Sequence, residues 1–248
     1  MRRLFIEEII DLEKNDAAIE ITGSDANHLL YAMRVRPGQQ FTIVDKAGQV
    51  VLAKVVCCTS DTVNLKYCGK VEDGDTEPPI SVVIAQCLPK GDKMDYIVQK
   101  AVELGADEIV PTVSRHCVVK YDAKKRQSRR AKWQKISDEA AKQCGRTALP
   151  AVASVTELCE LVQLYPDHVK LACYESEKQQ GLKEVLQKCS GGNYLLLIGP
   201  EGGFAPEEIA LCKEHGFISI SLGRRVLRTE TASLAALAAL MYEKGDLS

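Results

Sequence analysis

Two segments near the carboxyl end of the chain constrain its fold more than any other feature. Residues 195–204 read LLLIGPEGGF, and residues 222–232 read LGRRVLRTETA. In each, an apolar strand runs into a loop rich in glycine or polar residues, and a helix follows. In open α/β sheets, ligands bind where parallel strands end at their carboxyl edge. Two such loops close together in sequence therefore predict one ligand site built from both.

The chemistry of the two loops suits a polar ligand with an anionic partner. The first, at residues 199–203, offers close backbone approach at its glycines, a rigid bend at Pro200 and the Glu201 carboxylate. The second offers Arg224, Arg225 and Arg228 beside Glu230. A tight turn without a ligand and arginines that pair with carboxylates to anchor a helix are the structural alternatives.

Composition is that of an ordinary globular protein. The chain has 248 residues, of which 46% are hydrophobic and 27% are charged. No apolar run approaches the ~18 residues of a membrane-spanning helix, so we expect no membrane partner. The cysteines include no C-x-x-C pair and the four histidines are isolated, so no metal site is expected. Scattered single cysteines are typical of reduced thiols in the cytoplasm.

The first part of the chain is rich in short β segments, and a linker separates it from the rest. The sequence predicts a domain at residues 1–72, a linker at 73–79 within the acidic, proline-ended stretch EDGDTEPP, and a second domain at 80–248. A helix at 25–34, with Ser24 as its N-cap, interrupts the strands. Residues 46–48 favour a hairpin turn. Several short strands with turn signals indicate a small barrel. The strands are expected at residues 3–6, 17–21, 40–45, 50–59 and 62–71.

Beyond the linker, strands and helices alternate. This rhythm predicts an α/β domain with a mostly parallel sheet covered on both faces. Strands are expected at residues 81–86, 108–113, 116–120, 169–174, 194–198 and 217–222. Helices are expected at residues 92–104, 124–144, 156–164, 182–189, 206–215 and 229–244.

Positive charge is concentrated in residues 115–146, although the formal net charge of the chain is −2. Only Asp122, Asp138 and Glu139 oppose the lysines and arginines there. Such a patch attracts phosphates by releasing their counterions, which favours RNA binding. A solvated helix face is the structural alternative.

The spelling IGPEGGF…EEI…LGRRVLRTETA resembles the cofactor-binding signature of the RsmE family of SPOUT methyltransferases. The resemblance extends upstream to residues 88–94, 99–105 and 114–118. It implies a trefoil knot in the second domain and a PUA-like RNA-binding barrel in the first. It also implies methylation, with S-adenosylmethionine, of the N3 atom of a uridine in 16S ribosomal RNA of the small ribosomal subunit. A homodimer in the cytoplasm is implied as well.

The resemblance assigns residues to the cofactor, and the distribution of basic residues assigns others to RNA contacts. The cofactor is expected in three loops, at Leu171, Cys173, Tyr174, Ile198, Gly199, Pro200, Glu201, Gly202, Gly203, Leu222, Gly223, Val226, Leu227 and Arg228. RNA contacts are expected at Arg2, Arg3, Arg34, Arg36, Arg115, Lys124, Lys125, Arg126 and Arg146.

Catalysis at uridine N3 needs a proton acceptor and a group that stabilises negative charge on the uracil oxygens. Glu230 and Glu201 are the candidate bases, and Arg228 is the candidate stabiliser. Glu201 bracing its own loop and Glu230 pairing with an arginine stay open as alternatives. At the level of function, a ribose 2′-O-methyltransferase and a non-catalytic RNA-binding assembly factor are the other interpretations.

Overall fold

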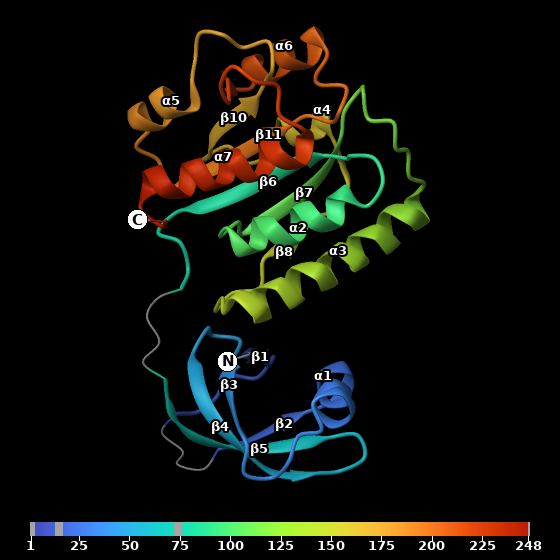
Figure 1. Ribbon diagram of the computed structural model, residues 1–248, viewed down its shortest axis with the longest axis vertical. Coiled ribbons are helices and arrows are strands. Elements are labelled where there is room, and N and C mark those ends of the chain that lie inside the picture. Colours follow the sequence, from blue (N-terminus) through green and yellow to red (C-terminus); the bar gives the residue numbers. More distant parts are fainter. Residues whose placement is uncertain (1–2, 13–16, 72–75, 248) are drawn as a thin grey trace. The chain divides into compact units, whose positions relative to one another are not determined.

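The computed structural model describes residues 3–12, 17–71 and 76–247. The chain forms two compact units. The first, called the barrel unit below, comprises Met1–Glu77 together with Ala141–Ala148. The second, the sheet unit, comprises Pro78–Ala140 and Leu149–Ser248. Figure 1 shows the elements of each.

The barrel unit is built on a five-stranded sheet in the order β1-β3-β4-β5-β2. All its pairs are antiparallel except β1 with β3. The expected hairpin turn at 46–48 joins β3 to β4, with Gly48 at φ 76°. Alternate apolar side chains of the strands form the core. The strands are β1 (Arg3–Phe5), β2 (Ala18–Ile21), β3 (Gln40–Val44), β4 (Val50–Cys58) and β5 (Val63–Lys70).

The helix of the barrel unit differs from the prediction. It starts earlier, as α1 (Gly23–Asn27), and continues as a π-helix, η1 (His28–Ala32). Ser24 is therefore wrong as the N-cap, because the extended residue before the helix is Thr22. The wider π turn keeps Leu29 fully buried in the barrel core.

The sheet unit contains a seven-stranded sheet whose pairs are all parallel. Its order is β12-β10-β11-β6-β7-β8, and β9 also pairs with β7. The central strands β6 and β11 are largely apolar because both faces of the sheet are covered, with Gln86 as a buried polar exception in β6. The strands are β6 (Ser81–Cys87), β7 (Glu108–Val113), β8 (Ala151–Val152), β9 (Thr156–Glu157), β10 (Val169–Cys173), β11 (Asn193–Ile198) and β12 (Ile218–Ile220).

Helices connect these strands. On one face of the sheet, α2 and α7 lie side by side, as Figure 1 shows. Elsewhere α6 packs with β12 and α4 with β7. The helices of this unit are α2 (Lys93–Glu103), α3 (Ala123–Cys144, of which the part from Ala141 belongs to the barrel unit), α4 (Leu158–Leu161), α5 (Leu182–Lys188), α6 (Pro206–Glu214) and α7 (Thr229–Lys244). Among the described residues, no helix is long and apolar enough to cross a membrane.

Two expectations for this unit are wrong. Residues 116–120 form no strand; a turn closed by the hydrogen bond from Cys117 N to Ser114 O leads into them instead. The helix expected at 156–164 shrinks to α4, because the two residues before it pair with β7 as strand β9. The short strand β8 was not predicted, since two residues carry too little periodicity.

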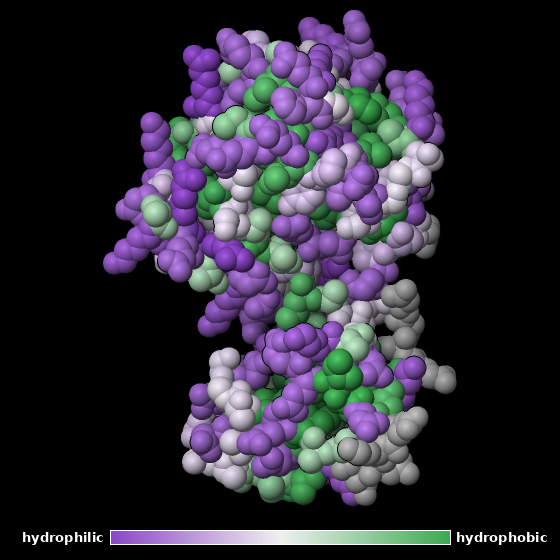
Figure 2. Space-filling view, turned by 180° about the vertical axis from the view of Figure 1, so that it is seen from behind, coloured by the Kyte–Doolittle hydropathy of each residue, from purple (hydrophilic) through white to green (hydrophobic). Residues whose placement is uncertain are grey.

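The surface of both units is mixed. Hydrophilic side chains predominate on the face that Figure 2 shows, with hydrophobic groups in patches between them. Large exposed apolar residues include Val118, Val226 and Tyr242, which lie far apart in the sequence. Scattered exposure of this kind is normal for a folded domain.

A buried ion pair closes the barrel unit. Arg146 is only 3% exposed, and its Nη2 donates to Glu77 Oε2 at 2.6 Å. The backbone N–H groups of Thr147 and Ala148 donate to Glu77 Oε1 at 2.6 and 3.1 Å. Burial alone would raise the pKa of Glu77, but the Arg146 guanidinium and these donors outweigh it and lower the pKa.

We therefore expect Glu77→Gln to destabilise the barrel unit in a pH-dependent way. A carboxyl with a lowered pKa stabilises the fold above its unfolded pKa of about 4.3, and this contribution is lost as the pH falls. Unfolding in urea should show a loss of about 1–3 kcal/mol at pH 7 that shrinks as the pH falls below about 4.3 and through the lowered pKa of the native state. The control is Glu7→Gln, since Glu7 is 93% exposed in a 3.9 Å ion pair with Lys46. Equal effects of both variants would contradict this account.

Candidate functional site

Three loops leave the same edge of the sheet and enclose a cavity. Strands β12, β10 and β11 are neighbours and run parallel, so their carboxyl ends lie together. The cavity between the loops that follow them has a volume of about 480 Å³. It is lined by Lys93, Cys173, Tyr174, Glu175, Ile198, Gly199, Pro200, Glu201, Gly202, Gly203, Ser221, Leu222, Gly223, Arg224, Arg225, Val226, Leu227, Arg228, Thr229 and Ala232.

Every residue assigned to the cofactor from the sequence lines this cavity, except Leu171. Leu171 is fully buried in the middle of β10, two residues before the strand ends, so its side chain packs in the core. The loops at residues 199–203 and 222–228 thus lie together, and the loop after β10 lies beside them.

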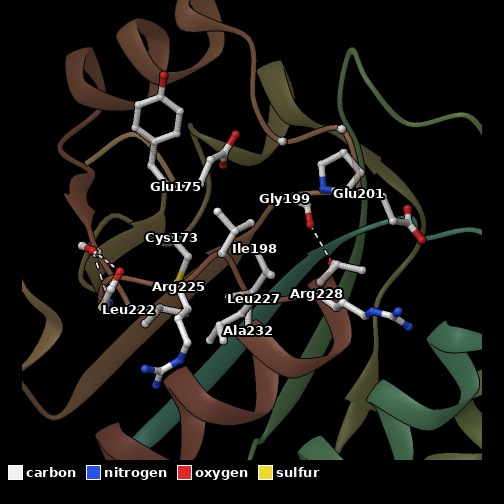
Figure 3. A pocket seen from close by; sticks show the side chains of 18 of the residues that line it. Cys173, Glu175, Ile198, Gly199, Glu201, Leu222, Arg225, Leu227, Arg228 and Ala232 are labelled. Carbon is white, nitrogen blue, oxygen red and sulfur yellow. Dashed lines mark hydrogen bonds between the residues drawn. The ribbon is translucent and has the colours of Figure 1, made fainter. Parts of the chain in front are cut away.

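The centre of the cavity is apolar. Figure 3 shows the side chains of Cys173, Ile198, Leu227 and Ala232 gathered between the loops. Burial raises the pKa of the Cys173 thiol to about 12, so it stays neutral and acts as a small apolar group. An apolar surface of this kind can hold one face of a planar ring, while the surrounding backbone supplies polar contacts.

The glycine loop leaves its backbone open to the cavity. Gly203 adopts φ 65°, a conformation that favours glycine, and a Cβ there would collide with the Glu175 carboxylate. His116 Nδ1 lies 3.0 Å from Gly202 O and 3.2 Å from Gly203 O. Because both partners are carbonyl oxygens, Nδ1 must carry the proton. His116 therefore holds the end of this loop, at Gly202 and Gly203.

A buried chain of hydrogen bonds holds the start of the glycine loop, at Gly199. Thr229 Oγ1, at the start of α7, donates to Gly199 O at 2.7 Å. It accepts from Gln86 Nε2 at 2.9 Å, and Ser233 Oγ donates to Gln86 Oε1. Gln86 is fully buried in β6. The chain thus joins β6, α7 and the first residue of the glycine loop.

We expect Thr229→Val to loosen the glycine loop. Valine keeps the shape of threonine but removes the hydroxyl, which leaves Gly199 O and Gln86 Nε2 without this partner at a cost of about 1–3 kcal/mol. Thermal unfolding should show the loss, and amide hydrogen exchange should rise at residues 199–203. Thr229→Ser keeps the hydroxyl and serves as the control. A valine variant with wild-type stability and exchange would contradict this role.

Lys93 and Glu201 line the rim of the cavity, and Lys93 also pairs with Glu230, which is not among the lining residues. Lys93 Nζ lies 2.9 Å from Glu201 Oε1 and 3.2 Å from Glu230 Oε2. Lys90 N also donates to Glu201 Oε1 at 3.1 Å. Burial would raise the pKa of Glu201, but Lys93 and the backbone donors lower it. The hydrogen bond from Lys93 to Glu201 is the main cause that raises the pKa of the lysine.

The arginines of the second loop are exposed. In Figure 3, the side chains of Arg225 and Arg228 extend away from the apolar centre on opposite sides. Neither guanidinium therefore fills the cavity. Arg228 also stands immediately before α7 as its N-cap residue.

Sequence reasoning missed some lining residues, namely Lys93, Ser221, Thr229 and Ala232. Lys93 lies in the segment 88–94 that carries the family resemblance, yet its distance from the loops in sequence hid its place. Among the described residues, no group of three or more histidine, cysteine or acidic side chains is arranged to hold a metal ion.

The residues expected to contact RNA fall into two groups. Arg34 and Arg36 in the barrel unit, and Arg115, Lys124 and Lys125 in the sheet unit, are exposed. Of these, Arg115 also pairs with Glu207 at 3.4 Å. Arg2 lies outside the described residues, and the other three are buried or held by internal partners. Arg3 and Arg146 are buried. Arg126 pairs with Glu157 at 2.7 Å and also donates to Tyr121 O and Val155 O.

Comparison with models of protein families shows which family the chain belongs to. An RNA methyltransferase domain matches residues 76–241, and an RNA methyltransferase PUA domain matches residues 21–56. The chain belongs to the RNA methyltransferase family. The first match covers the sheet unit with its cavity, and the second lies in the barrel unit.

Individual relatives place it on one branch of that family. Ribosomal RNA small subunit methyltransferase E of Bacillus subtilis is 35% identical over 98% of this chain and 97% of its own length. The methyltransferase E of Neisseria gonorrhoeae, solved with S-adenosyl methionine, is 30% identical with a TM-score of 0.90 over all of both chains. A methyltransferase of Legionella pneumophila, solved with the same cofactor, is 30% identical with a TM-score of 0.87, covering 97% of this chain and 96% of its own.

Proposed function

We propose that this chain is an S-adenosylmethionine-dependent methyltransferase that modifies the N3 atom of a uridine in 16S ribosomal RNA of the small ribosomal subunit. The observation that carries the proposal is the cavity at the carboxyl edge of the sheet, formed by the same loops that bear the family signature. The relatives' names give the ribosomal RNA of the small subunit as substrate. Uridine N3 as the target atom comes from the RsmE resemblance.

The residues that line the cavity also suit the chemical groups of the cofactor. S-adenosylmethionine combines an adenine ring with a cationic sulfonium, which supplies the methyl group. The apolar centre around Ile198 and Leu227 suits the ring, and the glycine backbone at 199–203 offers polar groups that a Cβ would cover. Of the two carboxylates that line the cavity, Glu201 is paired with Lys93, and Glu175 can face the cationic sulfonium.

The residues at the rim supply what uridine N3 chemistry needs. The N3 proton must leave, and either Glu201 or Glu230 is placed to accept it. The exposed Arg228 guanidinium can donate to a uracil oxygen as negative charge develops, or hold the phosphate of the target nucleotide. The exposed cations Arg34, Lys124 and Lys125 supply electrostatic attraction to RNA.

Three further properties follow from the family resemblance and stay predictions: the trefoil knot, a homodimer and a cytoplasmic location. The small residues of α7 do not by themselves offer a dimer face. Ala236, in the middle of this helix, is fully buried within its own unit, where α7 packs with α2, α5 and β11. A dimer would use other, exposed residues.

The test of the proposed function is analysis of the product. Small-subunit ribosomal particles from cells that lack this chain are incubated with the protein and methyl-labelled S-adenosylmethionine, and the nucleosides are separated. The expected labelled product is 3-methyluridine. Label on a ribose 2′ oxygen would replace the proposal with a ribose methyltransferase. Cofactor binding without transfer to particles or naked RNA would favour a non-catalytic RNA-binding factor.

A second prediction tests the location of the cofactor. Gly203→Ala forces alanine into a left-handed conformation and displaces the Glu175 carboxylate, so we expect the affinity for S-adenosylmethionine to fall about tenfold or more. Gly216→Ala is the matched control, because Gly216 has φ 83° with no atom within 4 Å of an added Cβ, and lies at the end of α6. Calorimetric titration should show weaker binding in the first variant alone. Equal affinities would move the cofactor elsewhere.

A further inference from the structure

Lys93 joins two carboxylates that come from different parts of the sheet unit. Its ammonium lies on α2, Glu201 follows β11, and Glu230 belongs to the first turn of α7. The three side chains are 32%, 28% and 19% exposed. Lys93 also lines the cavity. A single cation therefore holds both candidate bases beside the cofactor loops.

The two carboxylates are not equivalent. Glu201 accepts hydrogen bonds from Lys93 Nζ and from the backbone N–H of Lys90, so it ties the glycine loop to the segment before α2. Glu230 Oε2 is buried and has no hydrogen bond of good geometry among the described residues; its ion-pair partner there is Lys93, at 3.2 Å. Glu230 therefore keeps the larger unused capacity to accept a proton.

We propose that Lys93 is a positioning residue of the methyl transfer: it divides the two carboxylates between two tasks, so that Glu201 braces the cofactor loop and Glu230 serves as the proton acceptor. This inference rests on the proposed function, which requires a base at uridine N3. It resolves the choice between Glu201 and Glu230 that the sequence leaves open.

The charges around Lys93 explain why the cation is needed. Glu201 faces it from the loop after β11, and Glu230 faces it from α7. Arg228 lines the cavity on the side where Glu201 lies, and its side chain is exposed to solvent. Without Lys93, two carboxylates would share a partly buried rim, and their repulsion would favour protonation of one of them.

The test is the pH dependence of kcat for Lys93→Met, measured at saturating S-adenosylmethionine. Removing the cation should raise the pKa of the base, so the acidic limb of the profile should move up by roughly one to two pH units. The loss of kcat should then grow as the pH falls, reach about tenfold or more below the acidic limb, and be small at pH 8. Lys93→Arg keeps the charge and should keep the acidic limb. Saturating cofactor removes from kcat any change that either variant makes in the affinity for S-adenosylmethionine.

Lys100→Met is the matched control. Lys100 lies on the same helix, has a similar exposure of 33% and pairs with Glu103 at 2.7 Å, but it does not line the cavity. Its profile should match that of the unaltered protein. A loss of kcat by the same factor at every pH in Lys93→Met would overturn the inference, because a merely structural role predicts that result.

An NMR titration separates this inference from the proposed function. The side-chain carboxyl carbons of Glu201 and Glu230 are followed against pH in the unaltered protein and in Lys93→Met, without RNA. We expect Glu230 to titrate at a higher pH in the variant. Unchanged titration of both carboxyls would overturn the role of Lys93. If the carboxyls titrate as expected but the unaltered protein transfers no methyl group, the role of Lys93 in holding the two carboxylates stands. The proposed reaction is then wrong.

Discussion

The buried side chain of Gln86 holds together the parts on which the site depends. Strand β6 adjoins β11 in the middle of the parallel sheet, and its Gln86 amide reaches Thr229 at the start of α7. Thr229 in turn holds Gly199 O, where β11 gives way to the glycine loop. A buried amide in an apolar sheet is costly unless it is satisfied, so this chain of donors allows few alternative arrangements. The cavity is consequently tied to the rigid centre of the sheet.

The sequence predicted those parts of the site that depend on residues close together in the chain. The change from an apolar strand to a polar or glycine-rich loop shows in the sequence where the strand ends. The parallel order β12-β10-β11 brings the carboxyl ends of these strands together. The bounds of β7 and α7 matched the prediction to the residue, because each has clear flanking signals. In the barrel unit, the five short strands were also located within a residue or two. Regular periodicity and turn residues are sufficient for such elements.

The errors arose where distant residues decide the local state. The π-helical turn at 28–32 has the composition of an ordinary helix, and the packing of Leu29 in the core favours the wider turn. Residues 156–157 pair with β7 and so leave the expected helix. Lys93 reaches the cavity from α2, more than 100 residues before Glu201 in the sequence. No pattern within a single segment contains these contacts, so no reading of one segment could have found them.

The basic run at 115–146 shows how a charge count can mislead about a binding surface. Several of its cations neutralise acidic partners within their own unit: Arg126 with Glu157, Lys132 with Asp95, Lys142 with Asp25 and Arg146 with Glu77. These side chains hold α3 and the turn after it in place. What remains available to phosphates is a smaller set, with Lys124 and Lys125 at the start of the helix. The paired cations thus have a structural role, and RNA binding by the exposed ones stays a prediction. Salt dependence of RNA binding should follow the exposed set alone, because only cations that lack a fixed internal partner can replace the counterions of the nucleic acid.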